Sequence, residues 1–305
     1  MAGNFWRSSH CLEWLLDKQY VLKNRESDIK ELGGEDEYQK LMIFFTGVTF
    51  SFGEKLGLRQ QVIATAVTYF KRFYAMYSLK SVDPWLMGQT ALFLASKIEE
   101  FGLVSQKSII QTCNSVIKQK FSQYFPREYP HKIQDVLDCE FILVEVLDCS
   151  LIVFHPYRSL LLYSENLSTS PNYQHDSSIL QKAWKIVNDS LRTDLMLYYP
   201  PYLISLGCLF LACVMDKKNE EAIQSWFADL LVDFSKVMEV VKTMTGLYCL
   251  WKNCDDDKDI FNLLSKMPKP KIHNANQQHN ISHQQVSNNN VMKSNVIQHQ
   301  ASRTK

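Results

Sequence analysis

Apolar residues recur along most of this chain at the three- and four-residue spacing that lines one face of an α-helix. Residues 10–23 carry leucines on one face with charged residues between them, which predicts an amphipathic helix. The glycines at 33 and 34 then interrupt the pattern. Further helices are predicted over residues 36–55, 60–77, 84–99, 105–117 and 131–147, and again over 156–166, 178–196, 201–215, 220–230 and 233–251. Because hairpin dipeptides such as Asn-Gly and Asp-Gly are absent, the predicted fold class is all-α.

The two sets of predicted helices form an internal repeat. The run PWLMGQTALFLAS (84–96) matches PYLISLGCLFLAC (201–213), with a shared proline at the start and a shared LFLA near the end. The chain therefore looks like two tandem units of roughly five helices each. The predicted division is an N-terminal helical segment (1–35), a first unit (36–152), a second unit (153–255), a C-terminal extension (256–268) and a polar tail (269–305).

Composition narrows the classes of function. Hydrophobic residues make up 46% of the chain and aromatic residues 12%, which is enough for a packed core. The formal net charge of +1 gives no support for a surface that attracts nucleic acid or anionic membrane. No stretch approaches the roughly 20 apolar residues of a membrane span, and the N-terminus lacks the apolar core of a secretory signal. We therefore expect an intracellular protein without a nucleic-acid or membrane partner.

No motif predicts a metal site, a cofactor or a catalytic centre. The eight cysteines are scattered and form no CxxC pair, which is typical of a reducing environment without structural zinc. Gly-rich phosphate loops, GxSxG and HExxH are absent. The tail over 269–305 is rich in Asn, Gln, His and Ser without apolar periodicity, so it is predicted to be disordered. We interpret its scattered histidines as polar residues and not as metal ligands.

One helix end carries an unexpected cluster of charges. In FLASKIEEFG (93–102), Lys97, Glu99 and Glu100 follow a run that otherwise has the pattern of core. A lysine at a helix end can simply be solvated and complement the helix dipole. The second unit, however, has Val214 at the equivalent position, so the fold itself does not require a charge there. This comparison suggests that Lys97 serves a partner.

Several runs outside the repeat carry a family resemblance: MAGNFWRSSHCLEWLLDKQ, RQQVIATAVTYFKRFYAMYSLKSVDPWLM, FHPYRSLLLY, WKIVNDSLRTDLMLYYPP and SKMPKPK. Together with LASKIEE they resemble the cyclin family, and within it the C-type cyclins, over about residues 1–270. The resemblance implies two five-helix cyclin boxes behind an N-terminal helix, and a non-catalytic subunit that activates a cyclin-dependent kinase. The implied partners are the kinase of the Mediator kinase module and that module's other subunits, regulating RNA polymerase II transcription in the nucleus.

The resemblance also implies which residues bind the kinase. Within the family, the lysine of the LASKIEE motif and a glutamate in the fifth helix of the first box face the C-helix region of the kinase. These positions are Lys97 and Glu140 here, with Glu99 and Glu100 nearby. A charge that is buried without a partner costs several kcal/mol, so we expect Lys97 and Glu140 to satisfy each other or the kinase.

Two runs depart from the pattern of many cell-cycle cyclins. Lys71 in TYFKRF stands where those proteins have an aspartate. The run LMIFF (41–45) lacks their arginine, and Val48 stands at the place of their tryptophan. Docking of substrate peptides on this helix is therefore not expected.

Two further candidate interfaces each allow two interpretations. The aromatic residues Trp6 and Trp14 look exposed, so the N-terminal helix either contacts the kinase or folds back onto its own boxes. Trp184, Asn188 and Asp189 form a polar, aromatic-edged patch on the first helix of the second box. This patch either receives another subunit of the module or belongs to an ordinary helix with a half-buried tryptophan.

The alternative function is a nucleic-acid-binding protein of the transcription factor IIB type, which also contains two cyclin-like repeats. That family normally has a zinc ribbon and a basic second repeat. The missing CxxC pair and the balanced charge both argue against this alternative.

Overall fold

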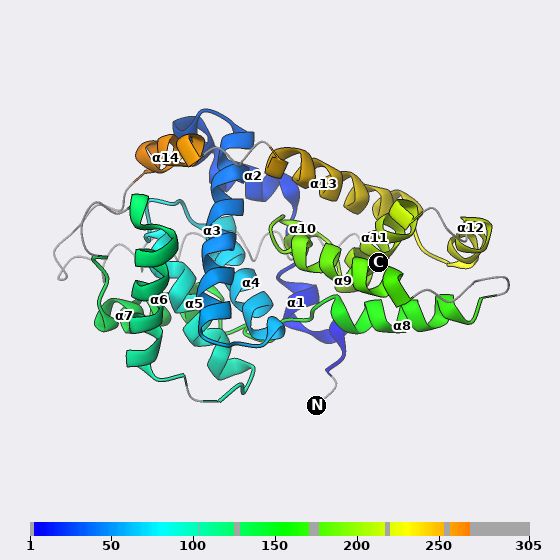
Figure 1. Cartoon of the computed structure of the whole chain (residues 1–305), viewed down its shortest axis with the longest axis horizontal. Helices are drawn as coiled ribbons and strands as arrows, with labels where there is room; N and C mark the ends of the chain where they lie inside the picture. The colour runs from blue at the N-terminus through cyan, green and yellow to red at the C-terminus, as the bar shows by residue number, and fades with distance from the viewer. Residues whose placement is uncertain are drawn as a thin grey trace.

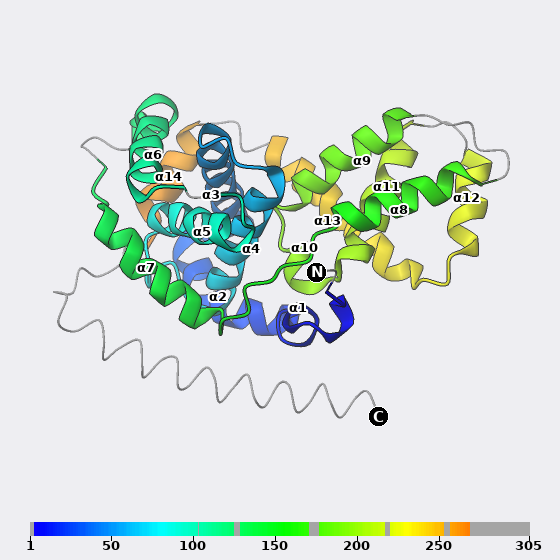
Figure 2. The same ribbon diagram turned by 90° about the horizontal axis from the view of Figure 1, so that it is seen from below.

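The computed structural model describes residues 3–102, 104–124, 129–170, 177–216, 220–252 and 257–268. Over these residues the chain forms helices and no strand, as the helical spacing predicted. Two groups of helices lie side by side, and the N-terminal segment runs across both (Figure 2). The tail over 269–305, predicted to be disordered, lies outside the described residues.

The N-terminal segment is not the continuous helix predicted over residues 10–23. A 3-10 turn, η1 (Phe5–Arg7), leads into the short helix α1 (Ser9–Leu12), and helix α2 (Lys18–Leu32) begins only after a break. Trp14 lies in this break and is completely buried, with the guanidinium of Arg72 4.7 Å from the centre of its ring. Asp17 restarts the helix by accepting the N–H groups of Gln19 and Tyr20. Burial of one aromatic side chain thus overrides the amphipathic pattern, and the expectation that Trp14 is exposed was wrong.

The first repeat packs around its third helix. Its helices are α3 (Glu35–Lys55), α4 (Gln60–Met76), α5 (Pro84–Ile98), α6 (Gln106–Lys120) and α7 (Ile133–Val146), with a 3-10 turn η2 (Ser122–Tyr124) after α6. Helix α5 contacts each of the other four. Asp83 caps α5 by accepting the N–H of Trp85, and Pro84 occupies the first turn, where its missing N–H costs nothing.

The second repeat is built in the same way around the equivalent helix. It contains α8 (Tyr157–Ser168), α9 (Ser177–Ser190), α10 (Leu195–Tyr198), α11 (Pro201–Asp216), α12 (Glu220–Asp229) and α13 (Phe234–Lys252). Helix α11, which matches α5 in sequence, contacts α8, α9, α12 and α13. The helix predicted over 178–196 is divided into α9 and α10. Because α8 precedes it, α9, which carries Trp184, is the second helix of this repeat and not the first.

The extension over 256–268 contains a further helix, α14 (Asp257–Lys266). No helix was predicted there from the sequence. This helix returns to the first repeat and packs against α2 and α3 (Figure 1). Its buried residues Ile260 and Leu263, and Met267 directly after it, join the main core. The last described helix therefore lies beside α2.

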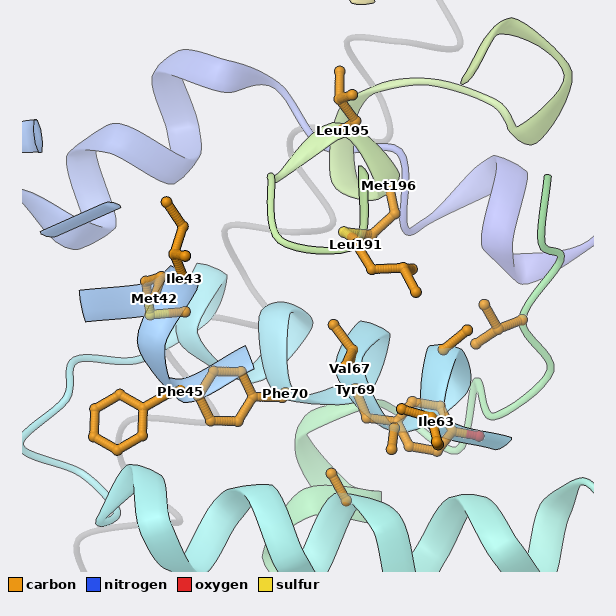
Figure 3. Packing of buried hydrophobic residues seen from close by; sticks show 14 of the residues in the cluster. Met42, Ile43, Phe45, Ile63, Val67, Tyr69, Phe70, Leu191, Leu195 and Met196 are labelled. Atoms are coloured by element: carbon orange, nitrogen blue, oxygen red, sulfur yellow. The ribbon is translucent and has the colours of Figure 1, made fainter. Parts of the chain in front are cut away.

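The two repeats share a continuous hydrophobic core. Figure 3 shows Leu191, Leu195 and Met196 of the second repeat close to the buried side chains of α3 and α4. Leu191 lies between α9 and α10, and Leu195 and Met196 lie in α10, which contacts α4. This stretch of the second repeat therefore packs against the first.

A buried ion triad crosses the same junction. Asp194 accepts from Nη1 of Arg25 in α2 at 2.5 Å and from Nζ of Lys71 in α4 at 3.2 Å. All three residues are almost completely buried. Burial raises the pKa of Asp194, but the charges of Arg25 and Lys71 outweigh burial and hold that pKa well below its usual range. The triad thus links the N-terminal helix and both repeats through one ionised carboxylate.

Candidate functional site

Lys97 and Glu140 meet on the surface between α5 and α7. Both carboxylate oxygens of Glu140 accept from Nζ of Lys97, at 2.7 and 2.8 Å. Nζ also lies 3.9 Å from the centre of the Phe93 ring, within the range of a cation–π contact. The side chain of Lys97 is 44% exposed and that of Glu140 is 14% exposed. The structure therefore brings together the two residues that the resemblance singled out, and each neutralises the other.

The local sequence explains why this pair stays at the surface. Cys139 and Leu143 turn into the core from α7, so Glu140 lies at the edge of the face packed on α5. Phe141, the next residue, is 77% exposed, which is unusual for a phenylalanine on a helix with a packed face. A charge pair next to an exposed aromatic ring can offer both hydrogen bonds and apolar area to a partner.

Glu99 does not join this pair. It lies at the C-terminal cap of α5 and accepts from Nε2 of Gln61 at 2.7 Å and from the hydroxyl of Thr65 at 2.5 Å. These contacts tie the end of α5 to α4. Glu100 is exposed, with a left-handed backbone (φ +48°) where the chain leaves the helix. Of the four residues in the predicted charged site, the structure brings together only Lys97 and Glu140.

The N-terminal segment folds back onto both boxes, which was one of the two open interpretations. Nδ1 of His10 accepts the backbone N–H of Phe154 in the linker between the repeats at 3.0 Å, and Glu13 accepts from the hydroxyl of Ser150 at 3.0 Å. Trp6 remains 59% exposed and lies 5.8 Å from the ring of Tyr202. Trp6 is therefore accessible to a partner in this conformation, whereas Trp14 is not.

Trp184 and Asn188 lie where α9 meets α8 and the start of α4. The ring of Trp184 is half-buried and lies 4.9 Å from that of Tyr157. Oδ1 of Asn188 accepts from the hydroxyl of Tyr157 at 3.0 Å and from Nε2 of Gln60 at 3.2 Å. Asn188 thus joins the two repeats, a role that helical spacing alone could not indicate because Gln60 lies 128 residues away.

Asp189 points to a different neighbour. Its Oδ2 accepts from the hydroxyl of Tyr248 in α13 at 3.1 Å. Burial raises the pKa of Asp189, and the hydrogen bond from Tyr248 and the charge of Arg192 oppose that rise. Sequence reasoning assigned no role to Gln60, Tyr157 or Tyr248, which are identified only by their contacts.

Two histidines beside the linker are neutral in the folded protein. Burial and the charge of Arg72 lower the pKa of His10 and of His155 to about 3. Nε2 of His155 lies 2.7 Å from the hydroxyl of Thr65, which is consistent with the linker role expected for this residue and gives no indication of a general base.

We expect the free energy of unfolding to fall as the pH drops from about 6.5 toward 3 because of His10. Its folded-state pKa of about 3 lies far below the value of about 6.5 in an unfolded chain. Between these values the unfolded state binds a proton that the folded state does not. Stability therefore decreases by about 1.4 kcal/mol for each pH unit of acidification from this one histidine. Urea unfolding at a series of pH values measures the slope.

The variant His10→Asn isolates this contribution, because the asparagine oxygen can still accept the N–H of Phe154 but does not titrate. We expect a shallower slope for His10→Asn than for the wild-type protein over this pH range. A wild-type slope in His10→Asn would show that His10 is not the source of the acid sensitivity.

The described residues contain no group of three or more His, Cys, Asp or Glu side chains that could hold a metal ion. Among the same residues, no helix is both long enough and apolar enough to cross a membrane.

Two family models match the chain. The model described as "Cyclin, N-terminal domain" matches residues 38–152, and the model described as "Cyclin C-terminal domain" matches residues 155–252. Together they cover most of the chain, one on each repeat.

Curated relatives of high similarity carry the name Cyclin-C. The protein of Rattus norvegicus is 52% identical over 271 residues, covering 89% of this chain and 92% of the relative. The protein of Drosophila melanogaster is 51% identical and covers 89% of this chain and 98% of the relative. The protein of Caenorhabditis elegans is 37% identical, covering 88% and 94% respectively.

Solved structures support the same fold at lower identity. A chain in the CAK complex of Chaetomium thermophilum matches with a TM-score of 0.63 and 22% identity, covering 93% of this chain and 95% of that chain. A chain in the yeast TFIIK complex matches with a TM-score of 0.61 and 23% identity, covering 80% and 99%. The family models and the relatives favour a cyclin over the transcription factor IIB alternative. The chain belongs to the cyclin family and is a regulatory subunit of a cyclin-dependent kinase, not a catalyst itself.

Proposed function

We propose that this cyclin activates the kinase of a Mediator kinase module in the nucleus, and that Lys97 and Glu140 contact the C-helix of that kinase. The observation that carries the proposal is the Lys97–Glu140 pair itself, which is partly exposed on the first box and is followed in α7 by the exposed Phe141. Partly exposed ion pairs contribute only about 0–1 kcal/mol to folding. The second box has Val214 at the position of Lys97, so the pair is not a requirement of the fold.

The residue types fit a helix as the bound element. Lys97 has three N–H donors and can give at least one to the free carbonyls at the end of a helix, while Glu140 can accept backbone N–H groups. Phe141 would bury apolar area against the same helix. An active kinase requires the glutamate of its C-helix to pair with the lysine that holds the nucleotide phosphates. A cyclin that binds the helix-in state more tightly than the helix-out state shifts the kinase toward the active form.

Other subunits of the module would contact surfaces away from this pair. Trp6 is accessible, and Trp184, Asn188 and Asp189 are partly exposed on α9, where Asn188 also contacts the first box. The relatives named Cyclin-C and the TFIIK complex support a role in transcription and therefore in the nucleus. Trp14 is excluded from this interface because it is buried.

Co-purification tests the proposal directly. The full-length tagged protein is recovered from nuclear extract, and its partners are identified by mass. We expect one cyclin-dependent kinase together with Mediator subunits, and phosphorylation of a peptide from the RNA polymerase II tail that depends on the cyclin. Recovery of a different kinase without Mediator subunits, or no increase in phosphorylation, would overturn the assignment to this module.

A further inference from the structure

The ammonium of Lys97 lies over an aromatic ring as well as beside a carboxylate. Phe93 and Lys97 are one turn apart in α5, and helical side chains lean toward the N-terminus, so Lys97 reaches back over Phe93. Nζ lies 3.9 Å from the centre of that ring, while both carboxylate oxygens of Glu140 accept from it. Among the described cations that lie over a ring, this is the shortest distance to a ring centre. The Lys97 charge is therefore attracted by two separate groups.

The ring itself belongs to the core of the repeat. Phe93 is only 3% exposed. The second box has Phe210 at the equivalent position, where the ring meets two other phenylalanine rings edge-on, with 5.1 and 5.4 Å between centres. Val214 follows Phe210 at the distance in sequence at which Lys97 follows Phe93. Packing thus accounts for a phenylalanine in both boxes, but it does not account for the cation that the first box places over the ring.

Kinase binding would change what the ammonium requires. The side chain of Lys97 is 44% exposed in the free cyclin, so water compensates much of its charge. A kinase that covers Lys97 removes this water, and burial of an ion is costly unless nearby groups compensate for it. Glu140 compensates less once its oxygens also accept backbone N–H groups of the kinase. The negative face of an aromatic ring attracts a cation, and this attraction is larger in a desolvated site than at an exposed one.

We propose that Phe93 is a positioning residue for kinase binding, whose ring face stabilises the Lys97 ammonium when the kinase covers it. The ring attracts the charge as a whole, so the N–H groups of Lys97 can still donate to carbonyls of the kinase. This role rests on the proposed contact between Lys97 and the kinase. Because the attraction grows on desolvation, its effect appears in the affinity for the kinase and not in the stability of the free cyclin.

Fluorine on the ring tests this role without removing the ring. In the full-length protein, Phe93 is replaced by phenylalanine analogues that carry one, two or three fluorine atoms, and each variant is titrated with the purified kinase. Each fluorine withdraws electron density from the ring face and weakens its attraction for a cation, while the side chain stays apolar and nearly the same size. We expect kinase binding to weaken stepwise, by about fivefold with three fluorines, which is within the range of a desolvated cation–π contact.

The second box offers a matched control. The same analogues at Phe210 place fluorine on the equivalent core ring, where Val214 brings no charge, so kinase binding should not change. A second control repeats the Phe93 series in Lys97→Met, in which fluorine should have no effect because the cation is absent. Urea unfolding of every variant measures whether the fold tolerates fluorine. If three fluorines destabilise the protein, the variants with one fluorine at Phe93 and at Phe210 provide the same comparison.

The possible failures are distinguishable. Unchanged binding across the Phe93 series, together with weaker binding in Lys97→Met, would overturn the role of the ring and leave the kinase contact in place. Equal losses at Phe93 and Phe210, or equal losses with and without Lys97, would reveal an effect of packing and would also overturn that role. If Lys97→Met binds the kinase as tightly as the wild-type protein, the proposed contact of Lys97 is itself wrong.

Discussion

Replacing Asp194 by asparagine is expected to lower the free energy of unfolding by about 3–5 kcal/mol, the range found when one partner of a buried ion pair is removed. Asp194 is the carboxylate between Arg25 and Lys71, and all three are almost completely buried. Asparagine preserves the size of the side chain but not its charge, so two cations would remain buried without an anion. Urea unfolding followed by circular dichroism measures the loss.

The triad contains two cations, Arg25 and Lys71, and only one carboxylate, and this imbalance leads to a second prediction. Lys71→Met removes one cation and leaves Arg25 and Asp194 as a one-to-one pair. Burial lowers the pKa of Lys71 and outweighs the opposing charge of Asp194, which shows that its charged form is poorly compensated. We therefore expect Lys71→Met to cost about 1 kcal/mol or less, because a well-packed apolar residue can replace a buried charge at little cost.

Combining the two substitutions tests whether the residues act as a unit. In the double variant, Lys71→Met should recover part of the stability lost through Asp194→Asn, because only one cation then lacks a partner. Asp233→Asn, at an exposed carboxylate, is the control for the loss of a surface charge. If both single variants lost the same free energy of unfolding, and the double variant lost the sum of the two, the three residues would not form a coupled network.

The triad also explains why the N-terminal helix belongs to the fold. Arg25 in α2 donates both to Asp194 and to the carbonyl of Tyr74 at the end of α4. A helix held by two buried hydrogen bonds of a guanidinium, and covered on another side by α14, is part of the core and not an appendage.

Helix existence could be predicted from the sequence because apolar spacing is local. The boundaries of α3, α4 and α5 lie within a residue or so of the predicted ranges, and α5 and α11 proved to be equivalent central helices. The shared proline and LFLA run were enough to recognise this equivalence, since a central helix is constrained on nearly every face. Where a helix has one packed face, as in the N-terminal segment, the pattern was less reliable.

Long-range contacts could not be predicted in the same way. Lys71 and Arg72 are adjacent charges that the structure buries completely, which the sequence analysis did not predict. Nothing local identified Asp194, 123 residues away, as the partner of Lys71. Similarly, the burial of Trp14 depends on Arg72 of α4, and its sequence neighbours only suggested an exposed aromatic residue. The pairing of Lys97 with Glu140 was anticipated through the family resemblance, not through spacing.

Lys97→Glu is expected to weaken kinase binding by at least about thirtyfold, or about 2 kcal/mol, while changing the free energy of unfolding by about 1 kcal/mol or less. The pair is partly exposed in the free cyclin, so water screens the repulsion between the introduced carboxylate and that of Glu140. In the complex the same charges would be desolvated, and the kinase would meet a carboxylate where it requires a donor. Binding is measured by titration with the purified kinase, and unfolding by urea.

Exchanging both charges separates a contact from a structural role. In the double variant Lys97→Glu with Glu140→Lys, the ion pair can form again because α5 and α7 still pack together. Stability should return to the wild-type value, whereas kinase binding should not, since the groups of the kinase would now face reversed charges. Lys30→Glu, at an exposed pair with Glu26, is the control for charge alone and should leave binding unchanged. Recovery of kinase binding in the double variant would mean that the pair acts only by maintaining the structure of the cyclin. The proposed direct contact of Lys97 and Glu140 with the kinase would then be rejected.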